Sequence, residues 1–165
     1  MTSKKKKSFY ITTTIPYVNA DPHIGFALEL VQSDAIARYH RLAGQEVFFS
    51  TGTDEHGQKI WEASQKEGKN VQDYVDHYAQ KFLDLKALLN ISNDNFIRTT
   101  SEGHVKAAQE FWRLCDAKGD IYKKKYKGLY CVGCEKFITE RDLINGKCEF
   151  HPTLTPEIVE EENYF

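Results

Sequence analysis

Two pairs of metal-binding residue types in the C-terminal part of the chain could hold a metal ion. Cys131 and Cys134 are separated by two residues, as are Cys148 and His151, and thirteen residues lie between the pairs. Two short chelate loops of this kind can present thiolates and an imidazole to one tetrahedral zinc ion. No carboxylate ligand or open coordination position is evident. The pattern therefore predicts a structural Zn²⁺ site that stabilises a segment too small to have a core of its own.

A second candidate site lies in PYVNADPHIGF, residues 16–26, where a β-branched run meets a helical pattern. The first N–H groups of a helix have no intrahelical partner and point beyond the end of the preceding strand, which makes this a natural phosphate site. Gly25 would let a ligand approach the backbone, and His23 could donate a hydrogen bond to developing phosphate charge. The alternative is a capping turn with a partly buried histidine, and these residues alone do not decide between the two.

A third set of polar side chains follows the next apolar run, in TGTDEHG, residues 51–57. Open α/β sheets bind ligands at the carboxyl ends of their strands, so this loop should lie at the same edge as residues 16–26. Asp54 could there bind an ammonium group through a charge-assisted hydrogen bond, and His56 could be a second polar wall or a turn residue. Acidic loop residues are usually only solvated, so Asp54 by itself does not establish a site.

Strands and helices that alternate along the chain must position these side chains. Apolar and β-branched runs predict strands buried on both faces at 8–15 and 46–52, and a short third strand at 95–100. A strand, a helix and a second strand within the first half of the chain form a βαβ unit, whose crossover is right-handed. The fold class expected is therefore α/β with a Rossmann-like parallel sheet.

Helical periodicity accounts for the segments between the strands. The first helix should have Asp21 as its N-cap, Pro22 at its first position and Gly44 as its stop. Its apolar stripe consists of Ile24, Ala27, Leu28, Val31, Ala35, Ile36, Tyr39 and Leu42. Further helices are expected at 57–66, 71–89 and 102–117, the last with Cys115 as a core thiol.

The composition changes at Gly119, where aromatic residues and lysines begin to alternate in DIYKKKYKGLYC. We therefore expect a Rossmann-like part at 1–118 and a small zinc-binding part at 119–165, which ends in the acidic run EIVEEENYF. Residues 1–7 carry four consecutive lysines and are expected to form a solvated, flexible tail, although a basic run can also contact a polyanion such as RNA.

Composition and net charge indicate a globular domain and argue against a nucleic-acid-binding or membrane protein. The 165 residues are 41% hydrophobic and 28% charged, as in ordinary globular domains, and a net charge of −2 gives no general attraction to nucleic acid or anionic membranes. No apolar run approaches the roughly 18 residues that a membrane span needs, and the N-terminus has no signal-peptide pattern. We therefore expect a cytoplasmic protein without membrane or DNA partners, whose cysteines are thiols or metal ligands.

Several motifs, in the same order, resemble the N-terminal part of class I aminoacyl-tRNA synthetases, specifically the methionyl-tRNA synthetase family. They are TTTIPYVNADPHIGF with its HIGH-like signature, ARYHRLAGQEVFFSTGTDEHG, FIRTT, GDIYKKKYKGLYCVGCEKF and ENYF. The resemblance extends from Ser8 to Phe165. It implies that residues 1–118 are the N-terminal half of the Rossmann-type catalytic domain and that 119–165 begin its zinc-binding connective insertion, which is truncated here.

The resemblance also implies a reaction and a set of site residues. Methionine would be activated by ATP, with Mg²⁺ on the phosphates, and then transferred from methionyl-adenylate to the acceptor end of tRNA(Met) for initiation and elongation. The positions that match methionine contacts are Ile15, Tyr17 and Asp54, the last taking the α-ammonium group. The positions that match ATP contacts are Pro16, His23 and Gly25, and the zinc ligands match a knuckle that helps to position the acceptor end.

Two departures from the family pattern bear on activity. The fourth position of the HIGH-like signature is Phe26, which completes the expected catalytic set with His23 and Gly25. Phenylalanine cannot donate to phosphate, so replacing Phe26 by histidine is expected to speed adenylate formation. In addition, nothing after residue 118 supplies the remaining strands, a KMSKS loop or an anticodon-binding domain. These 165 residues alone are therefore expected to be inactive in aminoacylation.

Two other interpretations remain. A stand-alone zinc-knuckle RNA-binding module could use the lysines at 123–127 and the interleaved tyrosines, but a dedicated RNA binder should be basic overall. A non-catalytic synthetase homologue would suit Phe26 and the early end of the chain. Such a homologue would bind methionine without catalysing ATP–pyrophosphate exchange.

Overall fold

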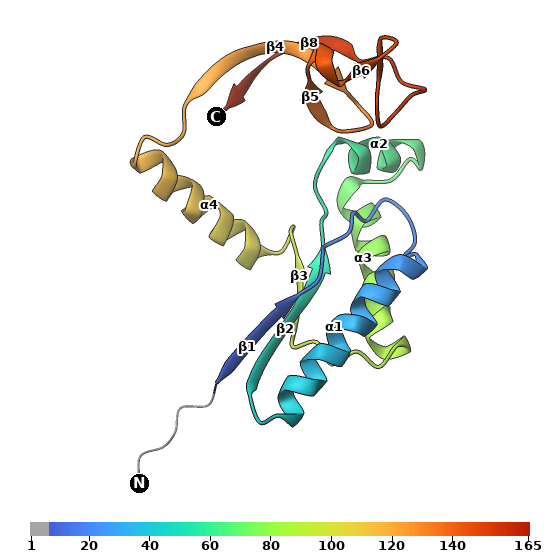
Figure 1. Ribbon diagram of the computed structural model, residues 1–165, viewed down its shortest axis with the longest axis vertical. Coiled ribbons are helices and arrows are strands. Elements are labelled where there is room, and N and C mark those ends of the chain that lie inside the picture. Colours follow the sequence, from blue (N-terminus) through green and yellow to red (C-terminus); the bar gives the residue numbers. More distant parts are fainter. Residues whose placement is uncertain (1–6) are drawn as a thin grey trace. The chain divides into compact units, whose positions relative to one another are not determined.

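A three-stranded parallel sheet organises the N-terminal part of the protein, as the computed structural model of the chain shows for its described residues, 7–165 (Figure 1). The strands are β1 (Ser8–Thr12), β2 (Glu46–Thr53) and β3 (Asn95–Arg98), with β2 in the centre. Ile11 lies opposite Phe49, and Thr51 lies opposite Phe96. The predicted α/β class with a parallel sheet is confirmed.

The edge strand β1 differs from the prediction. It is shorter than the 8–15 run, and its residues alternate between exposed and half-buried positions rather than being buried on both faces. Tyr10 on β1 and Phe48 on β2 stack on each other, and both are exposed. The reason is that α1 (Ile24–Leu42) and α3 (Val71–Leu88) both pack on the opposite face (Figure 1). Strands buried on both faces need helices on both sides of the sheet.

The first helix, α1, begins two residues later than predicted. Its N-cap is His23, not Asp21, because the His23 ring accepts the Gly25 N–H whereas Asp21 forms an ion pair of 2.5 Å with Lys81 on α3. The predicted end is correct, since Gly44 has a φ of 78° and ends the helix in the left-handed conformation that glycine tolerates best.

The buried face of α1 is also not the predicted stripe. Ile24 and Leu42 of that stripe are 88% and 89% exposed. The face that packs on the sheet and on α3 carries Phe26, Leu30 and Ala37 instead, at the same helical spacing. Both faces of α1 are apolar, so periodicity reveals a helix without revealing which face meets the core.

The remaining helices follow the predicted positions closely. They are α2 (Gln58–Lys66), α3, whose N-cap Asn70 accepts the Gln72 N–H, and α4 (Glu102–Ala117). The expectation for α4 needs correction, because none of its residues is buried and Cys115 has intermediate exposure. Cys115 is therefore not a core thiol within the part of the chain that the structure describes.

The C-terminal part is a small antiparallel assembly. Strand β4 (Lys123–Cys131) pairs with β5 (Lys136–Ile138) on one side and with β8 (Glu157–Tyr164) on the other. Between β5 and β8 lie a 3-10 turn (Glu140–Asp142) and a hairpin of β6 (Leu143–Ile144) and β7 (Lys147–Cys148). The hairpin turn is Asn145–Gly146, both with positive φ, a common two-residue hairpin sequence.

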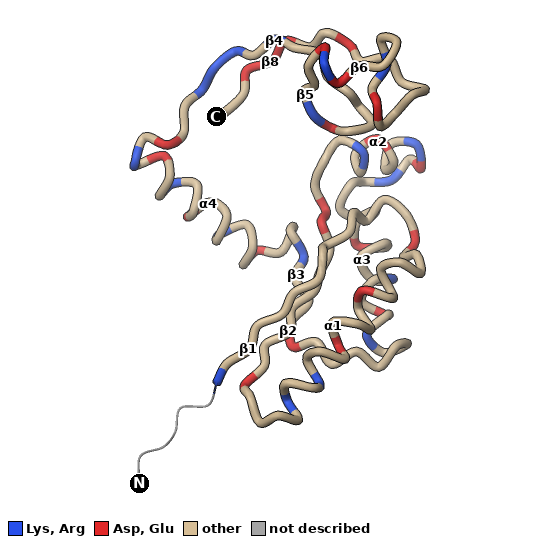
Figure 2. Tube along the Cα trace, in the orientation of Figure 1, with Lys and Arg blue, Asp and Glu red and all other residues tan. Residues whose placement is uncertain are grey.

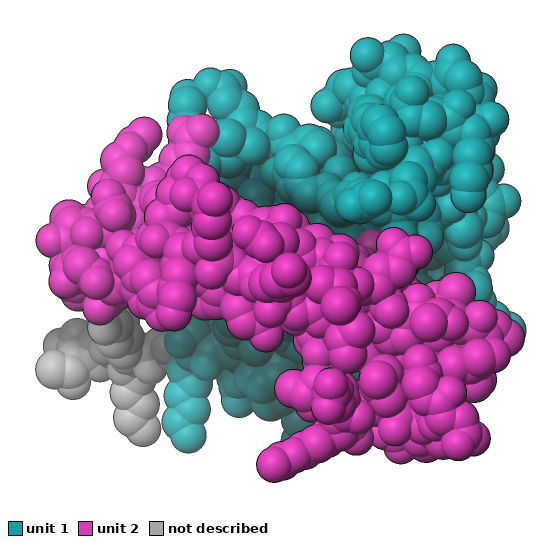
Figure 3. Space-filling view, turned by 90° about the horizontal axis from the view of Figure 1, so that it is seen from above, with its two compact units in different colours: residues 1–108 teal, residues 109–165 magenta. Residues whose placement is uncertain are grey.

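Contacts divide the chain into unit 1, residues 1–108, and unit 2, residues 109–165, which Figure 3 colours separately. This border falls inside α4, whereas the change in composition suggested 118/119. The lysine run of the expected 1–7 tail lies outside the described residues except for Lys7. Among residues 7–165, no helix is long and apolar enough to cross a membrane.

Candidate functional site

A polar turn, residues 16–23, joins β1 to α1 at the carboxyl edge of the sheet. It borders a cavity of about 190 Å³ whose other walls are the rings of Phe26 and Phe82. Two contacts anchor the turn to α3: the Tyr74 hydroxyl donates to the Asn19 carbonyl (3.1 Å), and Lys81 pairs with Asp21. Burial raises the pKa of Tyr74 to about 12, so this hydroxyl stays a donor at neutral pH. The turn is thus a fixed wall of the cavity.

His23 caps the helix with its own ring. Its Nδ1 accepts the Gly25 N–H at 3.0 Å, so in the neutral ring the proton resides on Nε2, which is left as a donor. A Cβ on Gly25 would lie 2.8 Å from this ring, so only glycine fits beneath it. The capping turn is therefore present, but His23 is exposed rather than partly buried, and its role toward phosphate stays a prediction.

Phe26 lies on the floor of the cavity. Its side chain is 4% exposed and makes an edge contact with Phe82, with ring centroids 5.5 Å apart. Although this is the fourth position of the HIGH-like signature, the ring contributes packing to the core and no hydrogen bond. Of the three expected catalytic positions, only His23 has a polar side chain, since the Gly25 N–H is bonded to the His23 ring.

Two of the three residues expected to bind methionine are brought together. Residues 16–18 run beside Asp54 as a short parallel extension of the sheet, in which the Asp54 N–H donates to the Pro16 carbonyl (2.9 Å) and the Val18 N–H donates to the Asp54 carbonyl (3.3 Å). The Tyr17 ring lies against Gly57, whose φ of 113° favours glycine. Ile15 is exposed and does not line the cavity.

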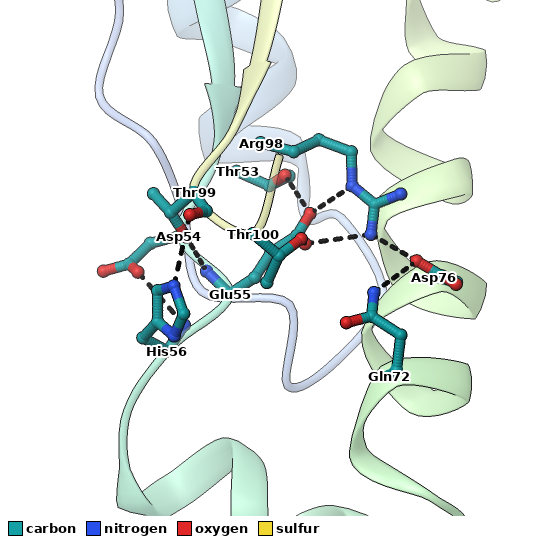
Figure 4. A network of polar contacts seen from close by, with 9 residues as sticks. All are labelled: Thr53, Asp54, Glu55, His56, Gln72, Asp76, Arg98, Thr99 and Thr100. Carbon is teal, nitrogen blue, oxygen red and sulfur yellow. Dashed lines mark hydrogen bonds and ion pairs between the residues drawn. The ribbon is translucent and has the colours of Figure 1, made fainter. Parts of the chain in front are cut away.

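The residue after Asp54 forms a network that the sequence did not suggest (Figure 4). The Glu55 carboxylate is fully buried and accepts two hydrogen bonds from the Arg98 guanidinium, at 2.7 and 2.9 Å. Thr53 and Thr100 donate their hydroxyls to the same carboxylate. Arg98 also pairs with Asp76 on α3, at 2.5 Å. A buried carboxylate needs such compensation, because an unpaired one would be very costly.

The network explains two shifts in pKa. Hydrogen bonding to Glu55 and Asp76 raises the pKa of Arg98, and hydrogen bonding from Arg98 lowers the pKa of Asp76. Both groups are therefore charged at neutral pH. One signal in the sequence could have revealed Glu55: an acidic residue that continues the face of a buried strand needs a cation opposite it.

The four predicted metal ligands meet in unit 2, and their donor atoms all lie within 4.8 Å of one another. His151 Nδ1 is 3.2 Å from Cys134 Sγ and 3.9 Å from the sulfurs of Cys131 and Cys148. A tetrahedral zinc ion with bonds of about 2.3 Å to sulfur and 2.0 Å to nitrogen requires ligand separations of roughly 3.5–3.8 Å. The separations scatter around this range, so three sulfurs and His151 Nδ1 form a donor set of the kind that holds a metal ion.

The turn in CVGC makes room for the imidazole. A Cβ on Gly133 would lie 2.6 Å from the His151 ring, so a larger residue would displace this ligand. Burial, followed by hydrogen bonding with Cys148 and Cys131, raises the pKa of the Cys134 thiol to about 11. Three sulfurs this close cannot all be thiolates without a cation between them.

Comparison with known proteins identifies the family to which the chain belongs. The family model for class I tRNA synthetases (M) matches residues 9–158. The chain belongs to this family. It is 52% identical over 160 residues to the methionine--tRNA ligase of Thermotoga maritima, which covers 95% of this chain and 25% of that protein. It is 48% identical over 160 residues to the enzyme of the same name from Rhizobium meliloti, covering 95% of this chain and 31% of that protein.

A solved structure shares the fold of this family member. Mycobacterium tuberculosis methionyl-tRNA synthetase in complex with methionyl-adenylate superposes with a TM-score of 0.86 at 42% identity, over 96% of this chain and 32% of that chain. The chain thus spans about a quarter to a third of the length of the relatives that it matches.

Proposed function

We propose that the protein containing this chain is a methionine–tRNA ligase, which activates methionine with ATP to methionyl-adenylate and transfers it to tRNA(Met). One observation carries the proposal: backbone pairing between residues 16–18 and Asp54 holds the His23–Gly25 turn and the Asp54 carboxylate at one edge of the sheet. Family membership and a neighbour bound to methionyl-adenylate support it.

Each group has a role in this proposal. Asp54 binds the α-ammonium group of methionine through a charge-assisted bond, and Tyr17, with Ile15, forms the start of the pocket for its side chain. His23 Nε2–H donates to phosphate oxygens as charge develops on them, at the start of α1 and next to Pro16. ATP enters as its Mg²⁺ complex. Catalysis then consists of positioning and charge stabilisation, without a protein nucleophile.

The four-ligand cluster supports a structural Zn²⁺ in this proposal. Bound there, zinc would link the CVGC turn to the β7 segment and keep the connective insertion (residues 119–165) folded. The insertion then helps to position the acceptor end of the tRNA, and the protein works in the cytoplasm as a translation enzyme. The 165 residues alone are expected to show no aminoacylation.

The alternative of a stand-alone RNA-binding module is weakened by unit 2 itself. Lysines of β4 run beside glutamates of β8 (Figure 2). Ion pairs join Lys123 to Glu162 at 2.5 Å and Lys127 to Glu160 at 3.8 Å. The Tyr126 ring packs edge-on against Phe137 instead of standing free to stack on bases. The charge of this surface is therefore partly neutralised and one of its rings is packed, whereas single-strand binders keep basic grooves and open aromatic rings.

The proposal is tested by amino-acid-dependent ATP–pyrophosphate exchange with the full-length gene product. Exchange should require methionine, and His23→Ala should slow it by about 10²–10³-fold, the usual cost of one oxyanion-type donor. Glu110→Gln serves as a control, because Glu110 forms an exposed ion pair on α4. Methionine binding without exchange would instead identify a non-catalytic homologue, and zinc-dependent RNA binding without either would favour the binding module.

A further inference from the structure

The Glu55 carboxylate ties together three elements at the edge where the proposed site lies. It follows β2, its Arg98 partner ends β3, and through Arg98 it reaches Asp76 on α3 (Figure 4). The backbone around it is fixed as well, since the Glu55 N–H donates to Thr99 Oγ1 at 2.8 Å. The four hydrogen bonds to this carboxylate come from Thr53 in β2, from Arg98 at the end of β3 and from Thr100 in the turn after β3.

Residues 53–56 alternate in direction like a strand. Thr53 and Glu55 point to the side of Arg98, whereas Asp54 and His56 lie on the other side (Figure 4). The His56 imidazole Nε2 donates to the Thr99 carbonyl at 3.2 Å, and the His56 N–H donates to the Asp54 carboxylate at 3.3 Å. Asp54 and Glu55 share one peptide unit, so the hydrogen bonds that hold Glu55 also hold the backbone that carries the Asp54 side chain.

We propose that Glu55 is a positioning residue: clamped by Arg98, it fixes where the Asp54 carboxylate stands and so sets the affinity for the ammonium group of the amino acid. This inference rests on the proposed function. Arg98 is suited to the task because its planar fork binds both carboxylate oxygens, which lysine cannot do. Asp76 is half-exposed and contacts only one outer nitrogen of Arg98, so it contributes less.

The test compares Glu55→Gln, Arg98→Lys and Asp76→Asn in the full-length gene product. Glu55→Gln keeps the shape of the side chain but loses the charge, so the KM for methionine in ATP–pyrophosphate exchange should rise by about 10-fold or more, with the KM for ATP changed less than about twofold. Arg98→Lys should raise the methionine KM by an intermediate factor, and Asp76→Asn should leave it nearly unchanged.

Asp34→Asn is the matched control for simple destabilisation. Asp34 is a buried carboxylate on α1 that accepts hydrogen bonds from Arg38 (2.6 Å) and from Ser92. Ser92 precedes β3, so this network lies at the opposite edge of the same sheet. Its loss should lower the melting temperature of unit 1 as Glu55→Gln does, but it should leave the methionine KM unchanged below the melting transition.

Amide hydrogen exchange tests the role of Glu55 without requiring activity, so it distinguishes an error in this inference from an error in the proposed function. In Glu55→Gln the amides of residues 53–56 should exchange faster, whereas in Asp34→Asn they should not. If the wild type catalyses no methionine-dependent exchange, the proposed function is wrong, and the amide data still decide whether Glu55 holds the loop. If the wild type is active and Glu55→Gln and Asp34→Asn change the methionine KM equally, or not at all, the positioning role is overturned.

Discussion

Unit 1 and unit 2 are held together by different forces. Unit 1 buries a continuous apolar cluster in which the sheet residue Phe49 packs with side chains of α1 and α3, such as Phe26 and Phe82. In unit 2 the buried cluster among the described residues is Cys131, Ile138 and Cys148, two of which are candidate metal ligands. The small unit has little apolar surface to bury, so a metal ion held by this cluster would supply much of its stability.

The two units also use charge differently. Unit 1 places its carboxylates Glu55 and Asp34 inside the fold, where each is paired with an arginine and accepts at least one hydroxyl hydrogen bond. Unit 2 places its ion pairs on the surface, on α4 and between β4 and β8. Buried pairs are costly to break from one side, whereas exposed pairs contribute little. The following predictions test this difference, from the largest effect to the smallest.

Metal removal should produce the largest difference in stability between the two units. Chelation, or Cys148→Ser, is expected to unfold residues 119–165, because structural zinc contributes on the order of 10–16 kcal/mol in zinc-finger peptides. Unit 1 should stay folded. Hydrogen-exchange mass spectrometry would show β4 and β8 losing protection while β2 keeps it, and metal analysis of the same samples would follow the zinc.

Cys115→Ser is the matched control for this experiment, since Cys115 is a free thiol outside the four-ligand cluster. It should keep both the metal and the protection of β4. Retained protection of β4 and β8 in metal-free Cys148→Ser would show that apolar contacts, not the metal, hold unit 2 together.

Phe26→His should lower the stability of unit 1 but raise its rate of ATP–pyrophosphate exchange. Burying an imidazole beside Phe82 should lower the free energy of unfolding by about 1–3 kcal/mol, while a new donor at the cavity floor should speed ATP–pyrophosphate exchange by up to roughly 10²-fold. Urea unfolding and exchange assays on the full-length gene product measure the two effects separately.

Phe26→Leu controls for the change in packing, because leucine also removes the ring contact but supplies no donor. It should destabilise unit 1 without a gain in rate. Equal rates for the histidine and leucine variants would mean that a missing donor at position 26 does not limit adenylate formation.

As the pH is lowered, unit 2 should unfold before unit 1. Burial alone would raise the pKa of Asp34, but hydrogen bonds from Ser92 and Arg38 hold it below the usual value, and Arg98 lowers the pKa of Asp76. Their stabilisation is therefore present above the unfolded pKa of about 3.9 and is lost as the pH falls through the lower folded values. Metal ligands must be deprotonated, so unit 2 should lose its metal at a higher pH.

A titration from pH 7 to pH 3, followed by metal release and by tryptophan and circular-dichroism signals, checks this order. Asp34→Asn should shift the acid transition of unit 1 and leave metal release unchanged. A single transition below about pH 4, with metal and both units lost together, would contradict the separate origins of stability.

The smallest change in stability is expected from the exposed ion pairs between β4 and β8. Lys123 and Glu162 are both about half-exposed, so Lys123→Gln should change the stability of unit 2 by less than about 1 kcal/mol, and less still at high salt. Tyr126→Ala is the comparison, because it removes a ring contact with Phe137 at 4.7 Å and should cost more. Thermal unfolding of the metal-bound protein measures both, and a larger loss for Lys123→Gln would give the ion pairs a structural role.

The sequence by itself determined the types and order of the main helices and strands of unit 1, the helix stop at Gly44 and the cluster of three cysteines and one histidine. These features depend on local spacing: helical or strand periodicity, a glycine in a left-handed conformation, and short chelate loops. Local spacing also placed Asp54 after a strand whose carboxyl end meets the 16–23 turn. Each of these inferences needs only a few neighbouring residues.

Only the tertiary structure decided which groups from distant segments meet. The sequence of α1 has apolar residues on two faces of the helix. Packing against α3 buries the face that carries Phe26 and Leu30. Asp21 could cap a helix locally, but Lys81 on α3 takes its carboxylate and His23 caps instead. Glu55 and Arg98 are 43 residues apart, so no local pattern pairs them. A buried charge finds its partner through the fold, because the cost of burial depends on what lies opposite it in space.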